Sequence, residues 1–148
     1  MKIVLSADHG GFELKEFIKS YLEGKGHNIT DVGTYSEASV DYPEYAEKAA
    51  EKIINNDVDF GIIFCGTGIG ISIAANKISG IRAALCHDIF TAKMAKMHNN
   101  ANILAIGGRV VGKGLAIEIV EAFINAEYEG GRHQLRVDKM MNLEKRGN

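Results

Sequence analysis

The sequence predicts one α/β domain, a doubly wound α/β/α sandwich with a five-stranded, mostly parallel sheet. Five short apolar runs alternate with segments whose apolar residues recur at helical spacing. Parallel strands need long crossover connections, and the helices that make them cover both faces of the sheet. The chain has 148 residues, 46% hydrophobic and 24% charged, without an internal repeat, low-complexity tract or linker. This length and composition suffice for one buried core.

The first half of the chain predicts three strands and two helices. Residues 3–7 form the first strand, and the helix that follows it ends at Gly24 and Gly26. The apolar positions of that helix, at i, i+3, i+4, i+7 and i+8, are Leu14, Phe17, Ile18, Tyr21 and Leu22. After a second strand at residues 29–32, an acidic cap and an early proline in Asp41-Tyr42-Pro43 begin the next helix. Residues 60–64 form the third strand.

The second half continues the alternation and then changes character. The expected elements are helices at residues 72–77, 89–97 and 115–124 and strands at residues 83–85 and 103–106. Residues 132–146 are charged and helical in tendency, with too few apolar positions to bury themselves alone. We therefore expect a single domain over residues 1–148, with residues 130–148 as a C-terminal helical extension that packs on a second subunit.

A cysteine and a glycine loop follow the third strand. Cys65 leads into Gly66-Thr67-Gly68-Ile69-Gly70, which predicts a turn from a buried strand into a helix. Without side chains at three of five positions, a ligand oxygen could approach the backbone N–H groups closely. The positive end of the following helix would add to this field and favour a thiolate at Cys65. The alternative is a cysteine buried only for packing.

Several familiar functions of a glycine loop are excluded by spacing. Ile71 stands where a dinucleotide-binding fingerprint needs its third glycine and where a cysteine phosphatase needs its arginine. The lysine and hydroxyl pair of a P-loop is also missing. What remains is a loop suited to an oxyanion, next to a thiol. Ligands of doubly wound sheets bind outside the carboxyl ends of the strands, so Asp8 and His9 should share a crevice with Cys65.

Other polar residues are candidates for the same site, each with a simpler alternative. Asp8 and His9 could merely cap a helix. His98, beside Asn99, could be an acid or base or could only complement a helix dipole. Arg132 and Arg136 stand four residues apart, so they share a helix face and could bind one phosphate, or lie on a solvated surface. Arg109 follows the fifth strand in Gly107-Gly108-Arg109.

Charge and cysteine content limit the partners and the compartment. A net charge of -2 and a pI near 6.2 provide no overall basic field for nucleic acid. No apolar run approaches the roughly 18 residues that a membrane span needs, and the chain does not begin like a signal peptide. We expect a cytoplasmic protein. Cys65 and Cys86 lack CxxC spacing, which argues against a disulfide scaffold or a cysteine zinc site.

Together these motifs resemble the ribose-5-phosphate isomerase B family, which includes isomerases of allose 6-phosphate and galactose 6-phosphate. The resemblance runs nearly end to end. It rests on Ser6-Ala7-Asp8-His9-Gly10-Gly11, Asp41-Tyr42-Pro43, Cys65-Gly66-Thr67-Gly68-Ile69-Gly70, Ser72-Ile73-Ala74-Ala75-Asn76-Lys77, His98-Asn99-Asn100-Ala101-Asn102, Gly107-Gly108-Arg109, and Arg132 with Arg136.

The resemblance implies an aldose–ketose isomerisation through an enediolate, without a metal or cofactor. It implies that His98 opens the sugar ring, with Asp8 and Thr67 in supporting roles, and that Cys65 moves the proton between C2 and C1. The residues so implied to bind substrate are Asp8, His9, Gly66, Thr67, Gly68, Ile69, Gly70, Asn99, Arg109, Arg132 and Arg136. One branch of the family carries a glutamate as the base where this chain has Ile71, so we assign the base to Cys65.

The family also builds each site across a dimer interface, and some members form tetramers. We therefore expect a homodimer or tetramer with active sites between subunits. Two alternatives remain open. The substrate could be a hexose 6-phosphate, and the chain could instead be a binding module or a partner subunit of a hetero-oligomeric galactose-6-phosphate isomerase.

Overall fold

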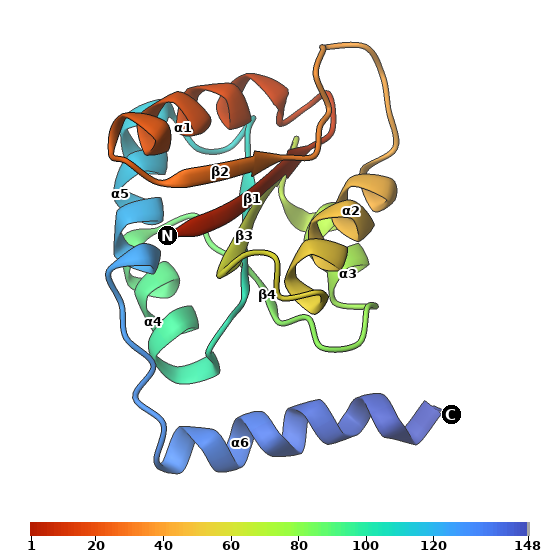
Figure 1. Cartoon of the computed structure of the whole chain (residues 1–148), viewed down its shortest axis with the longest axis vertical. Coiled ribbons are helices and arrows are strands. Elements are labelled where there is room, and N and C mark those ends of the chain that lie inside the picture. Colours follow the sequence, from red (N-terminus) through yellow and green to blue (C-terminus); the bar gives the residue numbers. More distant parts are fainter. Residues whose placement is uncertain (148) are drawn as a thin grey trace.

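The computed structural model describes residues 1–147, and it confirms the predicted doubly wound α/β sandwich (Figure 1). All five strands are parallel, in the order β2-β1-β3-β5-β4. The strands are β1 (Lys2–Ala7), β2 (Asn28–Asp31), β3 (Phe60–Cys65), β4 (Ala83–Leu85) and β5 (Ile103–Gly107). The helices are α1 (Phe12–Gly24), α2 (Tyr42–Ile54), α3 (Ile69–Ala75), α4 (Ile89–Asn99), α5 (Lys113–Ile124) and α6 (Arg132–Met141), followed by the 3₁₀ helix η1 (Asn142–Gly147).

Two apolar clusters form the core, one on each face of the sheet. Helices α1, α4 and α5 cover one face, and α2 and α3 cover the other. The central strands β3 and β5 are buried at every position, which explains why their sequences are continuous apolar runs without the alternation of a half-exposed strand. Strand β4 forms one edge of the sheet.

The largest boundary difference from the sequence prediction is at α3. We predicted a helix at residues 72–77, whereas it spans Ile69–Ala75. It begins early because Gly68, with φ of 76°, turns the chain directly from the loop into the helix. It ends early because the Asn76 side chain pairs with the backbone of Ala83, donating at 2.9 Å and accepting at 2.8 Å. The other predicted strands and helices of the sandwich differ from the structure by no more than two residues at their ends, whereas the helical segment predicted at residues 132–146 is divided into α6 and η1.

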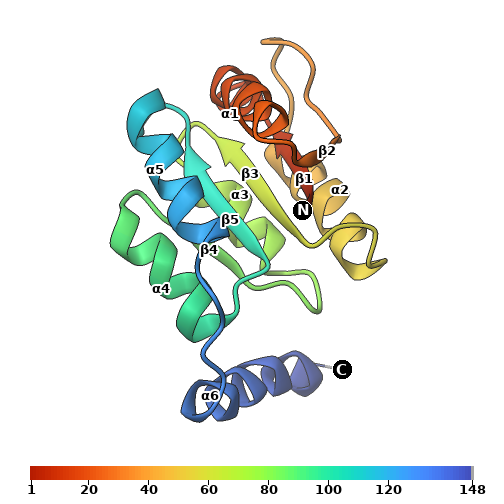
Figure 2. The ribbon, with the colours of Figure 1, turned by 60° about the vertical axis from the view of Figure 1, so that its left-hand side comes forward.

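The C-terminal segment is helical, as its composition predicts. Helix α6 buries only His133 and Val137, and Leu135 on its exposed side is 61% accessible. Figure 2 shows α6 standing outside the α/β sandwich, on the side where β5 begins. The predicted domain also includes Asn148, which lies outside the described residues. Among residues 1–147, every helix is too short or too polar to cross a membrane.

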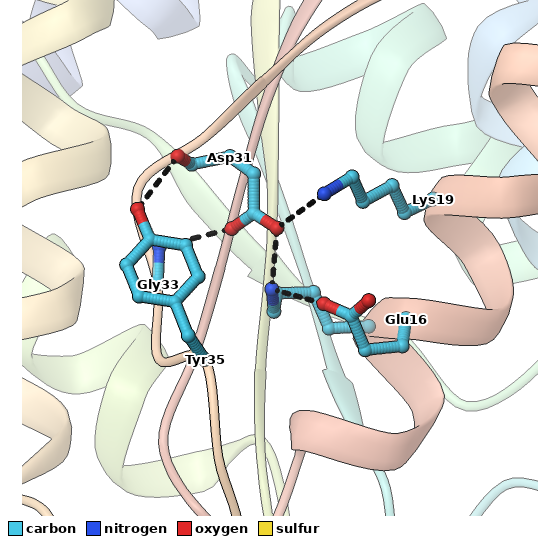
Figure 3. A network of polar contacts seen from close by, with 6 residues as sticks. Glu16, Lys19, Asp31, Gly33 and Tyr35 are labelled. Carbon is cyan, nitrogen blue, oxygen red and sulfur yellow. Dashed lines mark hydrogen bonds and ion pairs between the residues drawn. The ribbon is translucent and has the colours of Figure 1, made fainter.

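A buried ionic network joins α1 to the end of β2 (Figure 3). Lys15 of α1 is fully buried, and its Nζ donates to Asp31 Oδ2 and Glu16 Oε1, both at 2.7 Å. Lys19 Nζ donates to the same Asp31 oxygen at 3.0 Å, and the Gly33 N–H donates to Asp31 Oδ1 at 2.9 Å. Buried charges persist only when they are paired and hydrogen-bonded, so this network fixes how α1, β2 and the following loop fit together.

Candidate active site

Three loops meet where β1, β3 and β5 end. The Asp8 N–H donates to Phe64 O at 3.1 Å, which holds the loop after β1 against β3. On the other side of β3, the N–H groups of Gly108 and Arg109 donate to the carbonyl oxygens of Cys65 at 2.8 Å and Gly66 at 2.9 Å. The strand ends therefore form one shared edge, as expected for parallel strands.

Cys65 lies at the border between the core and the glycine loop. Its residue is 4% exposed and belongs to the apolar cluster on the α2 and α3 face. Its Sγ nevertheless accepts a hydrogen bond from the Gly68 N–H at 3.0 Å. The loop thus curls back over the sulfur and directs a backbone dipole at it, which is an interaction that a thiolate would strengthen.

The turn after Cys65 requires a glycine at position 68. A Cβ atom on Gly68 would lie 2.5 Å from Leu85 Cδ1 and 2.9 Å from the carbonyl carbon of Ile106, and φ is positive. A Cβ atom on Gly66 would lie 3.1 Å from Arg109 Nη1, so the Arg109 guanidinium lies directly over this glycine. Close approach of a positively charged side chain to open backbone suits an anionic ligand.

The rest of the loop is open to solvent. Thr67 and Ile69 are exposed, and Thr67 Oγ1 accepts a hydrogen bond from the Ile69 N–H at 3.2 Å. Ile71, where a glutamate would stand in the other branch of the family, is fully buried in the core. An acidic base at that position is therefore absent, and the thiol remains the candidate base of this loop.

Asp8 and His9 both contact backbone around the first loop. Asp8, 7% exposed, accepts from the N–H groups of Gly10 at 2.9 Å and Gly11 at 3.1 Å, so its carboxylate shapes the turn. His9 Nδ1 lies 3.2 Å from both the backbone N and the O of Val40. The Val40 backbone therefore holds the imidazole in place with either tautomer.

The remaining candidates form a second group elsewhere. His98, Asn99, Arg132 and Arg136 line one surface hollow of about 490 Å³ together with His133. His133 was not predicted from the sequence, because a histidine inside a charged helix carries no pattern of its own. Glu129 was not predicted either, and its carboxylate Oε2 lies 3.0 Å from His133 Nε2 and 3.9 Å from His98 Nε2.

The two groups lie at opposite ends of the parallel strands. Cys65 lies at the carboxyl end of β3. Helix α4 runs antiparallel to the strands, so His98, near the end of this helix, lies by their amino ends. There Asn102 O accepts from the Gly61 N–H at 2.9 Å, at the start of β3. The four steps along the strand from Gly61 to Cys65 span about 13 Å. One chain therefore does not bring the thiol and the histidine together.

Among the described residues, His98, Glu129 and His133 are close enough to be considered for a metal, with ligand atoms within 4.8 Å of one another. Their ring geometry does not suit one ion as it stands. The two imidazoles are stacked, with centroids 4.2 Å apart and planes inclined by 7°. Lone pairs in parallel rings point side by side, so both rings would have to splay before they could share an ion with tetrahedral geometry.

Fold and site together define a class: doubly wound α/β proteins with a thiol and a glycine loop at the carboxyl ends of the parallel strands. Residues 3–140 match the family model described as Ribose/Galactose Isomerase. The chain belongs to this family, which confirms the resemblance found in the sequence.

Individual relatives agree with the family assignment. The chain is 48% identical over 147 residues to ribose-5-phosphate isomerase B of Escherichia coli, covering 99% of each chain. The structure of the Clostridium thermocellum ribose-5-phosphate isomerase B has a TM-score of 0.99 and 49% identity over 100% of both chains. The Mycoplasma genitalium enzyme, solved with bound ribulose-5-phosphate, has a TM-score of 0.92 and 44% identity, covering 97% of this chain and 96% of that one.

Proposed function

We propose that this chain is an aldose–ketose isomerase that interconverts ribose 5-phosphate and ribulose 5-phosphate. The observation that carries the proposal is the Cys65 thiol beneath the glycine loop, with the Gly68 N–H directed at the sulfur and the Arg109 guanidinium over Gly66. A proton acceptor and an oxyanion site at one strand end are what proton transfer between adjacent carbons requires. The close relatives named above support the same reaction.

The proton transfer is assigned to the loop. Cys65, as the thiolate, takes the proton from C2 of the open-chain aldose, and the aldehyde oxygen at C1 becomes the oxyanion of the enediolate. Return of the proton to C1, with movement of the C2 hydroxyl proton to the C1 oxygen, gives the ketose. Backbone N–H groups of residues 66–70 would hold the oxyanion, and one such donor can lower the barrier by roughly 3 kcal/mol. No metal ion takes part in this scheme.

Ring opening and phosphate binding are assigned to the other candidates. Ribose 5-phosphate is mostly a closed ring, so His98 would protonate the ring oxygen before the transfer begins. His9, Arg109, Arg132 and Arg136 would bind the phosphate, and Asn99 the sugar hydroxyls. Thr67 would support ring opening, and Asp8 would do so by fixing the turn that presents His9.

Because the two groups of residues are separated within one chain, we propose a homodimer in which one subunit supplies Cys65 and the other His98. An exposed apolar face around the β4 edge supports this assembly. It consists of Ile69 and Ile73 on α3, Leu85 at the end of β4, and Ile89 and Phe90 at the start of α4, each 37% to 70% exposed. Helix α6 lies outside the sandwich, and its exposed Leu135 could contact a neighbouring subunit.

Mixing two inactive variants should restore activity. Cys65→Ala and His98→Asn homodimers each lack one half of every site. After subunit exchange, a heterodimer would contain one intact site and one doubly defective site. Random pairing should therefore recover about a quarter of wild-type activity.

The activity would be measured on the mixture after mild denaturation and refolding, with each variant treated alone as the control. A mixture no more active than its components, although heterodimers are present by native mass spectrometry, would contradict the shared site. So would a fully active monomer in sedimentation.

A substrate series should separate a pentose from a hexose isomerase. We expect the highest kcat/KM for ribose 5-phosphate, with allose 6-phosphate and galactose 6-phosphate at least about tenfold lower, since one extra carbon in a fitted pocket costs about that factor. The measurement is the initial rate of ketose formation on purified protein. Preference for a hexose phosphate would reassign the substrate, and binding without turnover of all three would favour a binding subunit.

A further inference from the structure

The stacked pair His98 and His133 has no assigned role beyond the acid function of His98. His98 is partly exposed, with 37% of its side chain accessible, whereas that of His133 is 11% accessible. His133 therefore lies beneath His98, between the hollow and the interior. One face of the His98 ring is covered by His133, which fixes the plane in which its nitrogens point.

A carboxylate stands at the edge of this pair. The Glu129 N–H donates to Met97 O at 3.0 Å, which attaches the segment before α6 to the last turn of α4. This bond brings Glu129 Oε2 within 3.0 Å of His133 Nε2 and 3.9 Å of His98 Nε2. The His133 contact is not aligned as a hydrogen bond, so the buried His133 Nε2 has no hydrogen-bond partner in the described structure.

The surroundings of the pair restrict the His98 ring from two sides. Stacking on His133, with centroids 4.2 Å apart, limits tilting of the ring. The Glu129 carboxylate at the edge of the pair limits its rotation in the ring plane. Arg132 and Arg136 line the same hollow, so the restricted ring faces the residues proposed to bind the phosphate.

We propose that His133 and Glu129 are positioning residues for His98. His133 sets the ring plane by stacking, and the Glu129 carboxylate, which lies beside both Nε2 atoms, limits rotation in that plane, so that His98 faces the ring oxygen of the substrate. This role rests on the proposed function, and it concerns ring opening alone. The proton transfer by Cys65, at the carboxyl ends of the strands, does not depend on His133 or Glu129.

The test separates ring opening from proton transfer. Ribulose 5-phosphate is always open, so exchange of its C1 proton with D₂O reports the Cys65 step alone. His133→Ala should lower kcat for ring-form ribose 5-phosphate by about 10- to 100-fold, the cost of misplacing a catalytic group, with little change in KM. The exchange reaction should stay near the wild-type rate. His133→Phe, which keeps an aromatic face, should recover most of the loss.

Glu129→Gln should lower the same kcat by about tenfold. Glu127→Gln, a matched change in the same exposed segment, should have no effect. As a readout independent of activity, NMR should show His98 ring protons shifted upfield by the stacked ring in the wild type and in His133→Phe, and unshifted in His133→Ala.

An active wild type with an unimpaired His133→Ala variant would overturn the positioning role alone. So would equal losses in His133→Ala and His133→Phe, or a parallel loss of conversion and exchange. A wild type that isomerises no sugar phosphate would overturn the proposed function, and the positioning role with it, even if the NMR shifts confirm the stack.

Discussion

Replacing Cys65 with alanine should reduce the interconversion of ribose 5-phosphate and ribulose 5-phosphate by about three orders of magnitude, the usual contribution of a positioned acid–base group. The physical reason is that no other acceptor is placed in the loop, where Ile71 is buried and apolar. Exchange of the C2 proton of ribose 5-phosphate with D₂O, followed by NMR, should fall by the same factor. Binding of the sugar phosphate, measured by calorimetry, should persist because the arginines are unchanged.

Cys86→Ala is the matched control for this experiment. Cys86 is 2% exposed, and burial raises the pKa of its thiol, with a partly opposing hydrogen bond to Thr91. It should therefore remain a neutral thiol that takes no part in the reaction, and its loss should leave activity close to wild type. A Cys65→Ala protein that retains most of its exchange activity would refute the assignment of the base.

Replacing Asp31 with alanine should cost about 3 to 5 kcal/mol of unfolding free energy, the usual effect of removing one partner from a buried ion pair. The substitution leaves the fully buried Lys15 ammonium with only Glu16, whose side chain is 42% exposed. Urea denaturation would measure the loss. Lys19→Met, which removes the more exposed of the two lysines, should cost no more than about 1 kcal/mol.

A double variant makes the test sharper. If the pair is coupled, Lys15→Met combined with Asp31→Ala should be less destabilising than the sum of the two single changes. Additive losses would show that Lys15 and Asp31 act independently. Equal costs for Asp31→Ala and Lys19→Met would contradict the central place of Asp31 in the network of Figure 3.

The same carboxylate predicts part of the acid sensitivity of the fold. Burial by itself raises the pKa of Asp31, but hydrogen bonds from Lys15, Gly33 and Lys19 outweigh it, and the net pKa is lowered. Its folded pKa is thus below its unfolded value of about 3.9, so its stabilisation is complete above that pH and disappears as the pH falls through the folded pKa. Asp31→Asn should remove this part of the pH dependence.

The network also connects stability to the site. The Tyr35 hydroxyl donates to Asp31 O at 3.0 Å, and the loop that contains Tyr35 continues to Val40, whose N–H contacts His9. Loss of Asp31 should therefore disturb the loop that holds His9, while the Cys65 loop, which is built on β3 and β5, is held by separate contacts.

Most of the fold could be predicted because its signals are local. Apolar runs, helical spacing and the cap at Asp41-Tyr42-Pro43 identified the five strands and the helices between them. The start of α3 was misplaced, because a glycine that ends a loop and one that begins a helix look alike until φ is known. A lysine beside Glu16 is typical of an exposed helix position, yet Lys15 is fully buried, and its buried partner Asp31 stands sixteen positions away.

The candidate site also has one part with a local sequence signal and one part that depends on tertiary contacts. The Cys65 loop was recognisable because its residues are consecutive, whereas Glu129 and His133 acquire meaning only beside His98. The residue roles remain predictions.

The sequence by itself determined the order of strands and helices, the glycine loop after Cys65 and the family, because spacing and composition along the chain encode them. Only the tertiary structure decided that Cys65 and His98 lie at opposite ends of the parallel strands. The reason is that each crossover helix returns antiparallel to its strands, so a residue at a strand end and one at a helix end are carried apart, however close their motifs stand in the chain.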